Sequence, residues 1–209
     1  MQNWRDSHVT KTCLAISFIL MILTWFEIVD VYDIFFSFSI AKKNNEWYRV
    51  LTANLFFGGF KLQTISMMFA FGQFSSMVES SIMSNHPFDF IIMILFGMSM
   101  NILSSPLTND MLFGPTLTAF MFYYWSKHYS DQSMNVMGLP INVKAIYVPF
   151  IYLLLALYEG GIRNAMAEIV GLLIGHLYYY LHDILDLRFG IKVLRTPDSI
   201  KNIIKYFVQ

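Results

Sequence analysis

The sequence predicts an all-α polytopic membrane protein. Of its 209 residues, 56% are hydrophobic and only 13% are charged, and the mean hydropathy is +0.51. A soluble domain usually carries about 25% charged residues, so this composition cannot cover the surface of a water-soluble globule. Long apolar windows recur along the chain, whereas strand-like alternation is weak, and an open sheet cannot cross lipid. A bundle of transmembrane helices is therefore the expected fold class.

Charge pattern and cysteine content exclude several classes of function. The 14 Lys and Arg residues are balanced by 14 Asp and Glu residues, and the longest basic run is the pair Lys42 and Lys43. This leaves no electrostatic basis for nucleic-acid binding. The single Cys13 cannot form an internal disulfide, and the sequence has no Cys/His cluster at zinc-ligand spacing. We expect no metal, no cofactor and no nucleic-acid partner.

Six windows are candidate membrane spans, because a helix that crosses the hydrocarbon needs about 20 mostly apolar residues. They are residues 10–29, 62–83, 88–105, 110–126, 145–158 and 164–182. The uncharged parts of several windows are shorter than a full span. This is typical either of a locally thinned bilayer or of flanking Lys, Arg and Tyr side chains that reach the interface.

The basic residues predict the orientation of the chain in the membrane. With six spans, both termini share one side with the second and fourth loops, and that side has more Lys and Arg residues than the other. It holds nine of the 14, namely Arg5, Lys11, Lys127, Lys144, Arg188, Lys192, Arg195, Lys201 and Lys205. Because cytosolic loops carry an excess of Lys and Arg, both termini are expected in the cytosol.

Two segments outside the six windows are expected to touch the membrane. Residues 30–60 form a long first loop that is first apolar and then polar, so it is predicted to lie in the interface or to dip partly into the bilayer. In the tail, Thr196 and Pro197 are typical of a helix start. The apolar spacing that follows predicts an amphipathic surface helix, with an unstructured tail as the alternative. We expect a membrane domain over residues 1–183 and a cytosolic tail over residues 184–209.

Ionisable side chains at membrane depth are candidates for function, because they are expensive to bury in lipid. Glu79 lies near the end of the second window, where it is either functional or caps a neighbouring backbone. Glu168 lies deeper in the sixth window and needs a partner or water. Further polar groups predict either a wet groove or interhelical hydrogen bonds; they are Gln63, Gln73, Asn101, His176 and His182.

The residues themselves give little support for nucleophilic catalysis. Ser99 follows Gly97 at Gly-x-Ser spacing, but Met100 stands where a second glycine would be expected. An activated serine needs a base within hydrogen-bond reach, and His176 is the candidate for that base. Gly171-x-x-x-Gly175 in the sixth window is a small-xxx-small pattern, which lets two helix backbones approach closely.

Several short motifs occur in a fixed order over nearly three quarters of the chain. They are residues 46–53 with Trp47, Tyr48, Arg49 and Thr52; residues 73–79 with Gln73, Ser75 and Glu79; residues 144–149; Gly160 and Gly161; residues 171–178 with Gly175, His176 and Tyr178; and residues 194–197. Together they resemble the motifs of the derlins, the rhomboid-like pseudoproteases of the endoplasmic reticulum. Tyr48 stands at the family's tryptophan position, and Trp47 is displaced by one.

The resemblance implies a rhomboid-like bundle of six transmembrane helices with a long, partly membrane-embedded first loop. It also implies a non-catalytic component of endoplasmic-reticulum-associated degradation, which assists retrotranslocation of misfolded proteins to the cytosol through a thinned membrane and a lateral polar groove. The implied partners are misfolded substrates, a membrane ubiquitin-ligase complex and other copies or relatives of the chain. The sequence is most similar to short fungal-type members and has no glycine after Gly190, so recruitment of the cytosolic AAA ATPase is expected to be indirect.

The same resemblance bears on catalysis and on the roles of single residues. At the positions of the rhomboid serine and histidine, this chain has Thr116 and Glu168, which lack the usual acid/base partnership. The chain is therefore expected not to be an enzyme. Two alternatives stay open: an intramembrane protease that uses Thr116 or Ser99, and a small channel or transporter with Glu168 as its selective site.

Roles are also predicted for the first-loop and sixth-window motifs. We expect Arg49, with Trp47 and Tyr48, to anchor the first loop through an interaction with Glu79. We expect Gly171 and Gly175 to allow close packing of the sixth window against a neighbouring helix.

Overall fold

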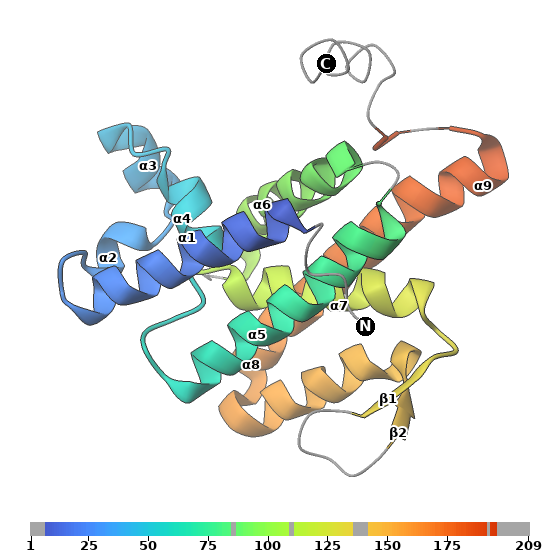
Figure 1. Cartoon of the computed structure of the whole chain (residues 1–209). Coiled ribbons are helices and arrows are strands. Elements are labelled where there is room, and N and C mark those ends of the chain that lie inside the picture. The colour runs from blue at the N-terminus through green and yellow to red at the C-terminus, as the bar shows by residue number, and fades with distance from the viewer. Residues whose placement is uncertain (1–6, 85–86, 109–110, 136–141, 192, 196–209) are drawn as a thin grey trace.

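The structure is a computed structural model of the chain, and it describes residues 7–84, 87–108, 111–135, 142–191 and 193–195. Five long helices form the bundle (Figure 1): α1 (His8–Trp25), α5 (Leu62–Met77), α6 (Pro87–Thr108), α7 (Gly114–His128) and α8 (Val148–Tyr179). Shorter elements connect or extend them: α2 (Val31–Ile34), α3 (Phe38–Asn44), α4 (Arg49–Leu55), the π-helix η2 (Val78–Ile82), strands β1 (Ser133–Asn135) and β2 (Asn142–Lys144), the 3₁₀ turn η3 (Ala145–Tyr147), the π-helix η4 (Tyr180–Ile184) and α9 (Leu185–Phe189).

The helical architecture expected from the composition is confirmed. Within the described residues, two helices are long and apolar enough to cross a membrane, over His8–Trp25 and Phe88–Pro106, and a shorter apolar helix covers Ala145–Tyr158. The number of six spans stays a prediction. The predicted boundary at residue 183 also stays a prediction, although helical structure continues through η4 and α9 to Phe189. The predicted amphipathic helix after Thr196 lies outside the described residues.

Helix α8 contains the fifth and sixth predicted windows, and a sharp kink at Gly161 separates them. The backbone of Gly161 has φ 66° and ψ −158°, a conformation that only glycine adopts without strain. The chain therefore turns at this point, and the two halves of α8 run in different directions (Figure 1). The first half follows the antiparallel β1–β2 hairpin, and the second half leads into η4 and α9.

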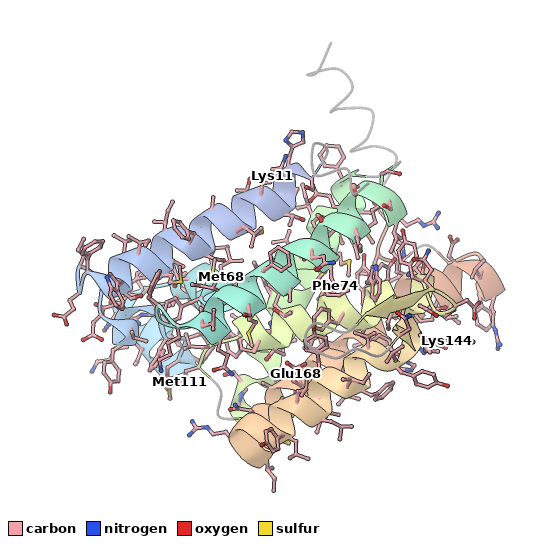
Figure 2. The ribbon with its side chains drawn as sticks, turned by 60° about the horizontal axis from the view of Figure 1, so that its bottom comes forward. Lys11, Met68, Phe74, Met111, Lys144 and Glu168 are labelled. Carbon is pink, nitrogen blue, oxygen red and sulfur yellow. The ribbon has the colours of Figure 1, made fainter. Side chains whose placement is uncertain are left out.

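Helix α7 lies in the middle of the bundle. Each of its residues from Gly114 to Ser126 is buried except Pro115, and α5, α6 and α8 all contact it. Aromatic side chains fill the space around it: the Phe74 ring of α5 lies 4.3 Å from the Phe122 ring, and the Phe120 ring lies 5.8 Å from the Tyr178 ring of α8. Figure 2 shows Phe74 on the interior side of α5.

The bundle has two ends, which we name by their landmarks. At the kink end lie the Gly161 kink, the start of α5 and the start of α7. At the hairpin end lie the starts of α1 and α6, the ends of η2 and α7, the β1–β2 hairpin, and η4. Lys11 and Lys144 are labelled near this end in Figure 2. Each end contains a cavity.

Candidate functional site

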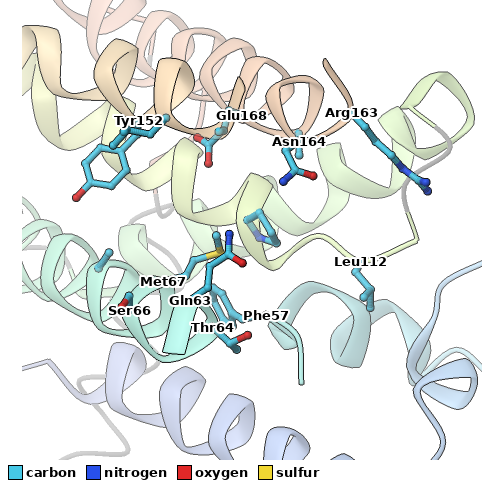
Figure 3. A pocket seen from close by; sticks show the side chains of 15 residues that line it. Phe57, Gln63, Thr64, Ser66, Met67, Leu112, Tyr152, Arg163, Asn164 and Glu168 are labelled. Carbon is cyan, nitrogen blue, oxygen red and sulfur yellow. The ribbon is translucent and has the colours of Figure 1, made fainter. Parts of the chain in front are cut away.

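A cavity of about 470 Å³ opens at the kink end between α5, the start of α7 and both halves of α8 (Figure 3). Its wall combines apolar side chains, such as Phe57 and Met67, with an unusual number of polar ones for a membrane bundle. The polar lining residues are Gln63, Thr64, Ser66, Tyr152, Arg163, Asn164 and Glu168. A partly apolar cleft with a few converging polar groups is the usual form of a binding site.

Glu168 is the most distinctive group in this cavity. Its residue is only 8% exposed, and its Oε2 atom has no hydrogen-bond partner within the described part of the chain. Figure 3 shows its carboxyl group pointing from α8 toward the side chains of α5. Because an unsatisfied buried polar group costs about 1–3 kcal/mol, this carboxyl group is a strong candidate for contact with something outside the chain.

The second half of α8 is held in place by its close approach to α7. A Cβ atom added to Gly171 would collide with the carbonyl oxygen of Thr116 and lie 2.5 Å from the Cβ of Ala119. A Cβ added to Gly175 would lie 2.7 Å from the Cβ of Tyr123. Only glycine fits at either position, so the two helix backbones touch one turn beyond Glu168.

Thr116 and Glu168, which the sequence resemblance places at the rhomboid catalytic positions, belong to these facing helices. Glu168 lines the cavity, whereas Thr116 is 2% exposed and does not line it. The other candidate nucleophile, Ser99, lies on α6 and donates its hydroxyl hydrogen bond to the Leu95 carbonyl at 2.7 Å. His176 is joined to the Tyr123 hydroxyl at 2.7 Å. Within the described residues, Ser99 and His176 do not form the pair considered from the sequence.

Glu79 caps helix α1. Ser7 stands at the N-cap position, but its side chain makes no capping hydrogen bond. Instead, Glu79 accepts from the Val9 and Thr10 backbone N–H groups at 2.9 Å each and from the Thr10 hydroxyl at 2.6 Å. A carboxylate at a helix N-terminus satisfies free N–H groups and complements the helix dipole. Of the two interpretations of Glu79, the structure therefore shows the capping one.

Arg49 holds the first loop together through contacts within the loop. The prediction that Arg49 interacts with Glu79 is wrong. Its residue is 5% exposed, and its guanidinium contacts the Glu46 carboxylate at 2.6 Å and donates to the Tyr32 and Phe35 carbonyls at 2.6 and 3.1 Å. A longer ion pair joins it to Asp33 at 3.7 Å. All these partners lie in the loop itself, so Arg49 ties α2 to α4, while Glu79 is fully occupied at the start of α1.

The remaining residues of the first-loop and second-window motifs have different surroundings. Trp47 and Tyr48 are 51% and 54% exposed, and the Thr52 hydroxyl donates to the Tyr48 carbonyl at 3.4 Å. Ser75 on α5 is fully buried, and no described group hydrogen-bonds its hydroxyl. Gln73 lies on the same helix and is half-buried. The anchoring role of Trp47 and Tyr48 and the placement of residues 30–60 in the membrane interface stay predictions.

The structure adds residues to the site that the sequence did not single out. Asn164 and Arg163 line the cavity beside Glu168, and Tyr152 faces them from the first half of α8. No local pattern marks these residues, because they come together only through the kink at Gly161. Within the described residues, no group of three or more His, Cys, Asp or Glu side chains could hold a metal ion.

Comparison with known proteins identifies the family. The model of the Der1-like family matches residues 7–198. The chain belongs to the Der1-like family. It is 25% identical to Derlin-1.1 of Zea mays over 95% of this chain and 82% of that protein. It is 24% identical to Derlin-2 of Oryza sativa subsp. japonica over 92% of this chain and 81% of that protein. It is also 24% identical to Derlin-2.2 of Arabidopsis thaliana over 92% of this chain and 82% of that protein.

The derlin resemblance of the motifs is thereby confirmed. Membership of the Der1-like family supports a role associated with endoplasmic-reticulum-associated degradation and a place in the endoplasmic reticulum membrane. It also argues against an enzymatic activity, because the derlins are rhomboid-like pseudoproteases.

Enlarging Gly171 is expected to destabilise this Der1-like protein. In Gly171→Leu the new side chain must separate α8 from α7, and overpacking of this kind costs about 1–3 kcal/mol or more. Denaturant unfolding in detergent micelles measures the change. Gly59→Ala is the matched control, because a Cβ at Gly59 meets nothing within 4 Å. Equal stability of Gly171→Leu and the wild type would contradict the close contact.

A double-mutant cycle tests the separate roles of Arg49 and Glu79. Because their partners are not shared, the losses in Arg49→Gln and Glu79→Gln are expected to add within about 0.5 kcal/mol. The positive control is the cycle of Arg49→Gln with Glu46→Gln, whose side chains touch and whose coupling energy should exceed that value. Unfolding of the wild type, the three single variants and the two double variants gives both coupling energies, and strong coupling of Arg49 to Glu79 would contradict their separate roles.

Proposed function

We propose that this Der1-like protein assists retrotranslocation of misfolded proteins from the endoplasmic reticulum to the cytosol without cleaving them. The observation that carries the proposal is the polar cavity between α5 and α8, which is lined by Glu168, whose Oε2 atom has no hydrogen-bond partner among the described residues. A polypeptide that crosses lipid must satisfy its backbone N–H and C=O groups, at several kcal/mol for each one left unsatisfied. A cavity with carboxyl, amide and hydroxyl groups lowers that cost for a bound segment.

Access to the cavity depends on the first half of α8. Phe150, Leu154 and Tyr158 on this half are exposed, as expected for a helix that faces lipid. In the proposed mechanism, a substrate segment enters laterally between this half of α8 and α5. Gln63 and Ser66 on α5 and Asn164 on α8 then supply hydrogen bonds along the path.

Membrane thinning is the second part of the proposal. The proposed arrangement has six spans, with both termini in the cytosol. Exposed aromatic and aliphatic side chains on the first loop, with Lys42 and Lys43 beside them, are suited to the interface; they are Phe38, Ile40, Trp47, Tyr48 and Leu51. Helix α7 has 15 residues and, at about 1.5 Å per residue, is shorter than the roughly 30 Å hydrocarbon layer. A short central helix favours a locally thinner bilayer.

The proposal contains no bond cleavage. Thr116 and Glu168 stand at the positions that resemble the rhomboid serine and histidine. Thr116 is buried against α8, and Glu168 is a carboxyl group where proteolysis would use an imidazole as the base. The proposed partners are misfolded proteins as substrates and a membrane ubiquitin-ligase complex, with the cytosolic AAA ATPase engaged through that complex. Association with further copies or relatives of this chain belongs to the same proposal.

The decay of a misfolded luminal substrate after translation arrest tests the proposed function. Cells that express the wild type, no protein, Glu168→Leu or Glu168→Gln are compared on an immunoblot that resolves fragments, with the proteasome active or blocked. Loss of one charged hydrogen bond, about 1.5 kcal/mol, slows a step by up to about tenfold. We therefore expect slower decay in Glu168→Leu, an intermediate rate in Glu168→Gln, and no discrete fragments.

Two controls separate function from folding. Glu168→Leu replaces an unsatisfied buried group with an apolar one, so its abundance and its free energy of unfolding should equal or exceed those of the wild type. Asp131→Asn changes an exposed carboxylate near the hairpin and should leave decay unchanged. Fragments that vanish when the protein is absent would indicate proteolysis, and unchanged decay without the protein would overturn the proposal.

A further inference from the structure

The carboxyl group of Glu168 lacks a hydrogen-bond donor. Glu168 is buried, and its Oε2 atom is shielded from solvent without a partner in the described part of the chain. An ionised carboxylate only accepts hydrogen bonds, so the missing partner is a donor. Among the described residues that line the cavity at the kink end, Glu168 is the only acid. The binding properties of this cavity therefore depend on which donor reaches Glu168.

The polar side chains beside Glu168 on α8 do not supply that donor. Asn164 lies one turn before Glu168, but its amide group lies over Gly160, because a Cβ added to Gly160 would collide with the Asn164 amide nitrogen. Arg163 is exposed, and Figure 3 shows its side chain pointing away from Glu168. Both side chains thus leave the carboxyl group open to the cavity.

The elements opposite Glu168 present neutral groups. On the first half of α8, the Tyr152 ring packs against the Phe122 ring, with 4.6 Å between their centroids, and the Tyr152 hydroxyl points away from Glu168 (Figure 3). The carboxyl group points toward α5, whose lining side chains are all uncharged; they are Gln63, Thr64, Ser66, Met67 and Ala70. Within the described part of the cavity wall, no positive charge therefore lies opposite Glu168.

Two other carboxyl groups of the bundle are paired within the chain. Glu79 accepts three hydrogen bonds at the start of α1. Asp183 lies in a second cavity, of about 210 Å³ at the hairpin end, where its Oδ1 atom is 3.5 Å from His128 Nε2 and 3.3 Å from His182 Nδ1. The other residues that line this second cavity are Ile82, Met83, Asp89, Tyr124 and Arg195. Glu168 differs from both carboxyl groups because no group of the described chain pairs with its Oε2 atom.

A Lys or Arg side chain is the donor that best complements Glu168. Its N–H groups fill the empty acceptor site, and its charge compensates a carboxylate that is shielded from water. An opposite charge within about 4–6 Å also favours the ionised form of a carboxyl group. A backbone N–H group or a Gln side chain would satisfy the oxygen without compensating its charge, and an Asp or Glu side chain would repel it.

The position of Glu168 makes this pairing selective. Glu168 belongs to the sixth predicted window, residues 164–182, and therefore lies below the membrane surface in the proposed arrangement. A basic side chain of a substrate segment at that level is expensive in lipid, so it gains free energy from a carboxylate inside a polar cavity. An apolar segment is already accommodated by lipid and gains little from the same carboxylate.

On the basis of the proposed function, we propose that the Glu168 cavity selects substrate segments that carry a Lys or Arg side chain at membrane depth. The basic side chain enters between α5 and the first half of α8 and forms an ion pair with Glu168. Segments with a neutral polar residue at the same position bind more weakly, and segments with an acidic residue are rejected. The cavity thus retains segments that lipid accommodates poorly.

Binding of model transmembrane peptides to the full-length protein tests this selection. The peptides share one host sequence of Leu and Ala, with Lys, Arg, Gln, Leu or Glu as the guest residue and a photoreactive group beside it. Protein and peptide are reconstituted in phosphatidylcholine vesicles, and the labelled fraction is measured after illumination. One hydrogen bond to a charged group supports about a tenfold difference in affinity. We expect the Lys and Arg peptides to label the protein at about tenfold lower peptide-to-lipid ratio than the Leu peptide, with the Gln peptide between them and the Glu peptide weakest.

Variants show whether Glu168 causes the preference. Glu168→Gln should be labelled alike by the Lys, Arg and Gln peptides, and Glu168→Lys should reverse the order, so that the Glu peptide labels best. A role of Glu168 in folding alone would lower labelling by every peptide equally and would not reverse the order. Asp131→Asn is the matched control, because it removes an exposed carboxylate that does not line the cavity; it should keep the wild-type order.

The outcomes separate this selection from the proposed function. Equal labelling by all peptides, no labelling by any peptide, or a Lys preference that survives in Glu168→Gln would overturn the selection, and the wild-type comparison needs no variant to fold. The proposed function has its own test in the decay of a misfolded luminal substrate. The selection can fail while that decay still depends on the protein, whereas unchanged decay without the protein overturns the proposed function itself.

Discussion

The contact between the backbones of α7 and α8 is the constraint on which the rest of the structure depends. Gly171 and Gly175 leave no room for side chains there, so the second half of α8 is fixed against the largely buried helix α7. Glu168 lies one turn before this contact and the His182–Asp183 pair lies two turns beyond it. The same close packing therefore sets the position of both cavities. The kink at Gly161 also matters, because it turns the first half of α8 so that a cavity lies between this half, the second half and α5.

Among the described residues, the buried charged groups differ in how far the fold satisfies them. Glu79 is occupied by three hydrogen bonds at the start of α1, and Arg49 is occupied by two carbonyls and a carboxylate in the first loop. Asp183 has two histidines beside it. Glu168 lies in a cavity with an unpartnered oxygen. In the proposed function, such a group contacts a polar segment of another chain, whereas the paired charges stabilise the fold itself.

The two ends of the bundle have different physical characters. The kink end combines exposed apolar side chains with a polar cavity, which suits contact with lipid and with an unfolded segment at the same time. At the hairpin end, the Asp183 carboxylate of η4 lies beside His128 of α7 and beside His182, and the strength of this contact between helix ends depends on protonation. The second half of α8 and its continuation η4 connect the two ends, so they position residues of both the Glu168 cavity and the hairpin-end cavity.

By itself the sequence determined the helical membrane class, because long apolar windows and a low content of charged residues indicate that the surrounding solvent is lipid. It also determined the family, because motifs such as Gly171-x-x-x-Gly175 keep their order along the chain. The sequence indicated Glu79 and Glu168 as unusual, because a charge in an apolar window is visible without a structure. Only the tertiary structure decided that Glu79 caps α1 and that Arg49 pairs within its own loop, because partners distant in sequence depend on helix packing and on the π-helical turn that carries Glu79. The cavities, with Asn164 in one and Arg195 in the other, follow from the Gly161 kink and the Gly190 turn, which reverse the chain in ways that local patterns do not specify.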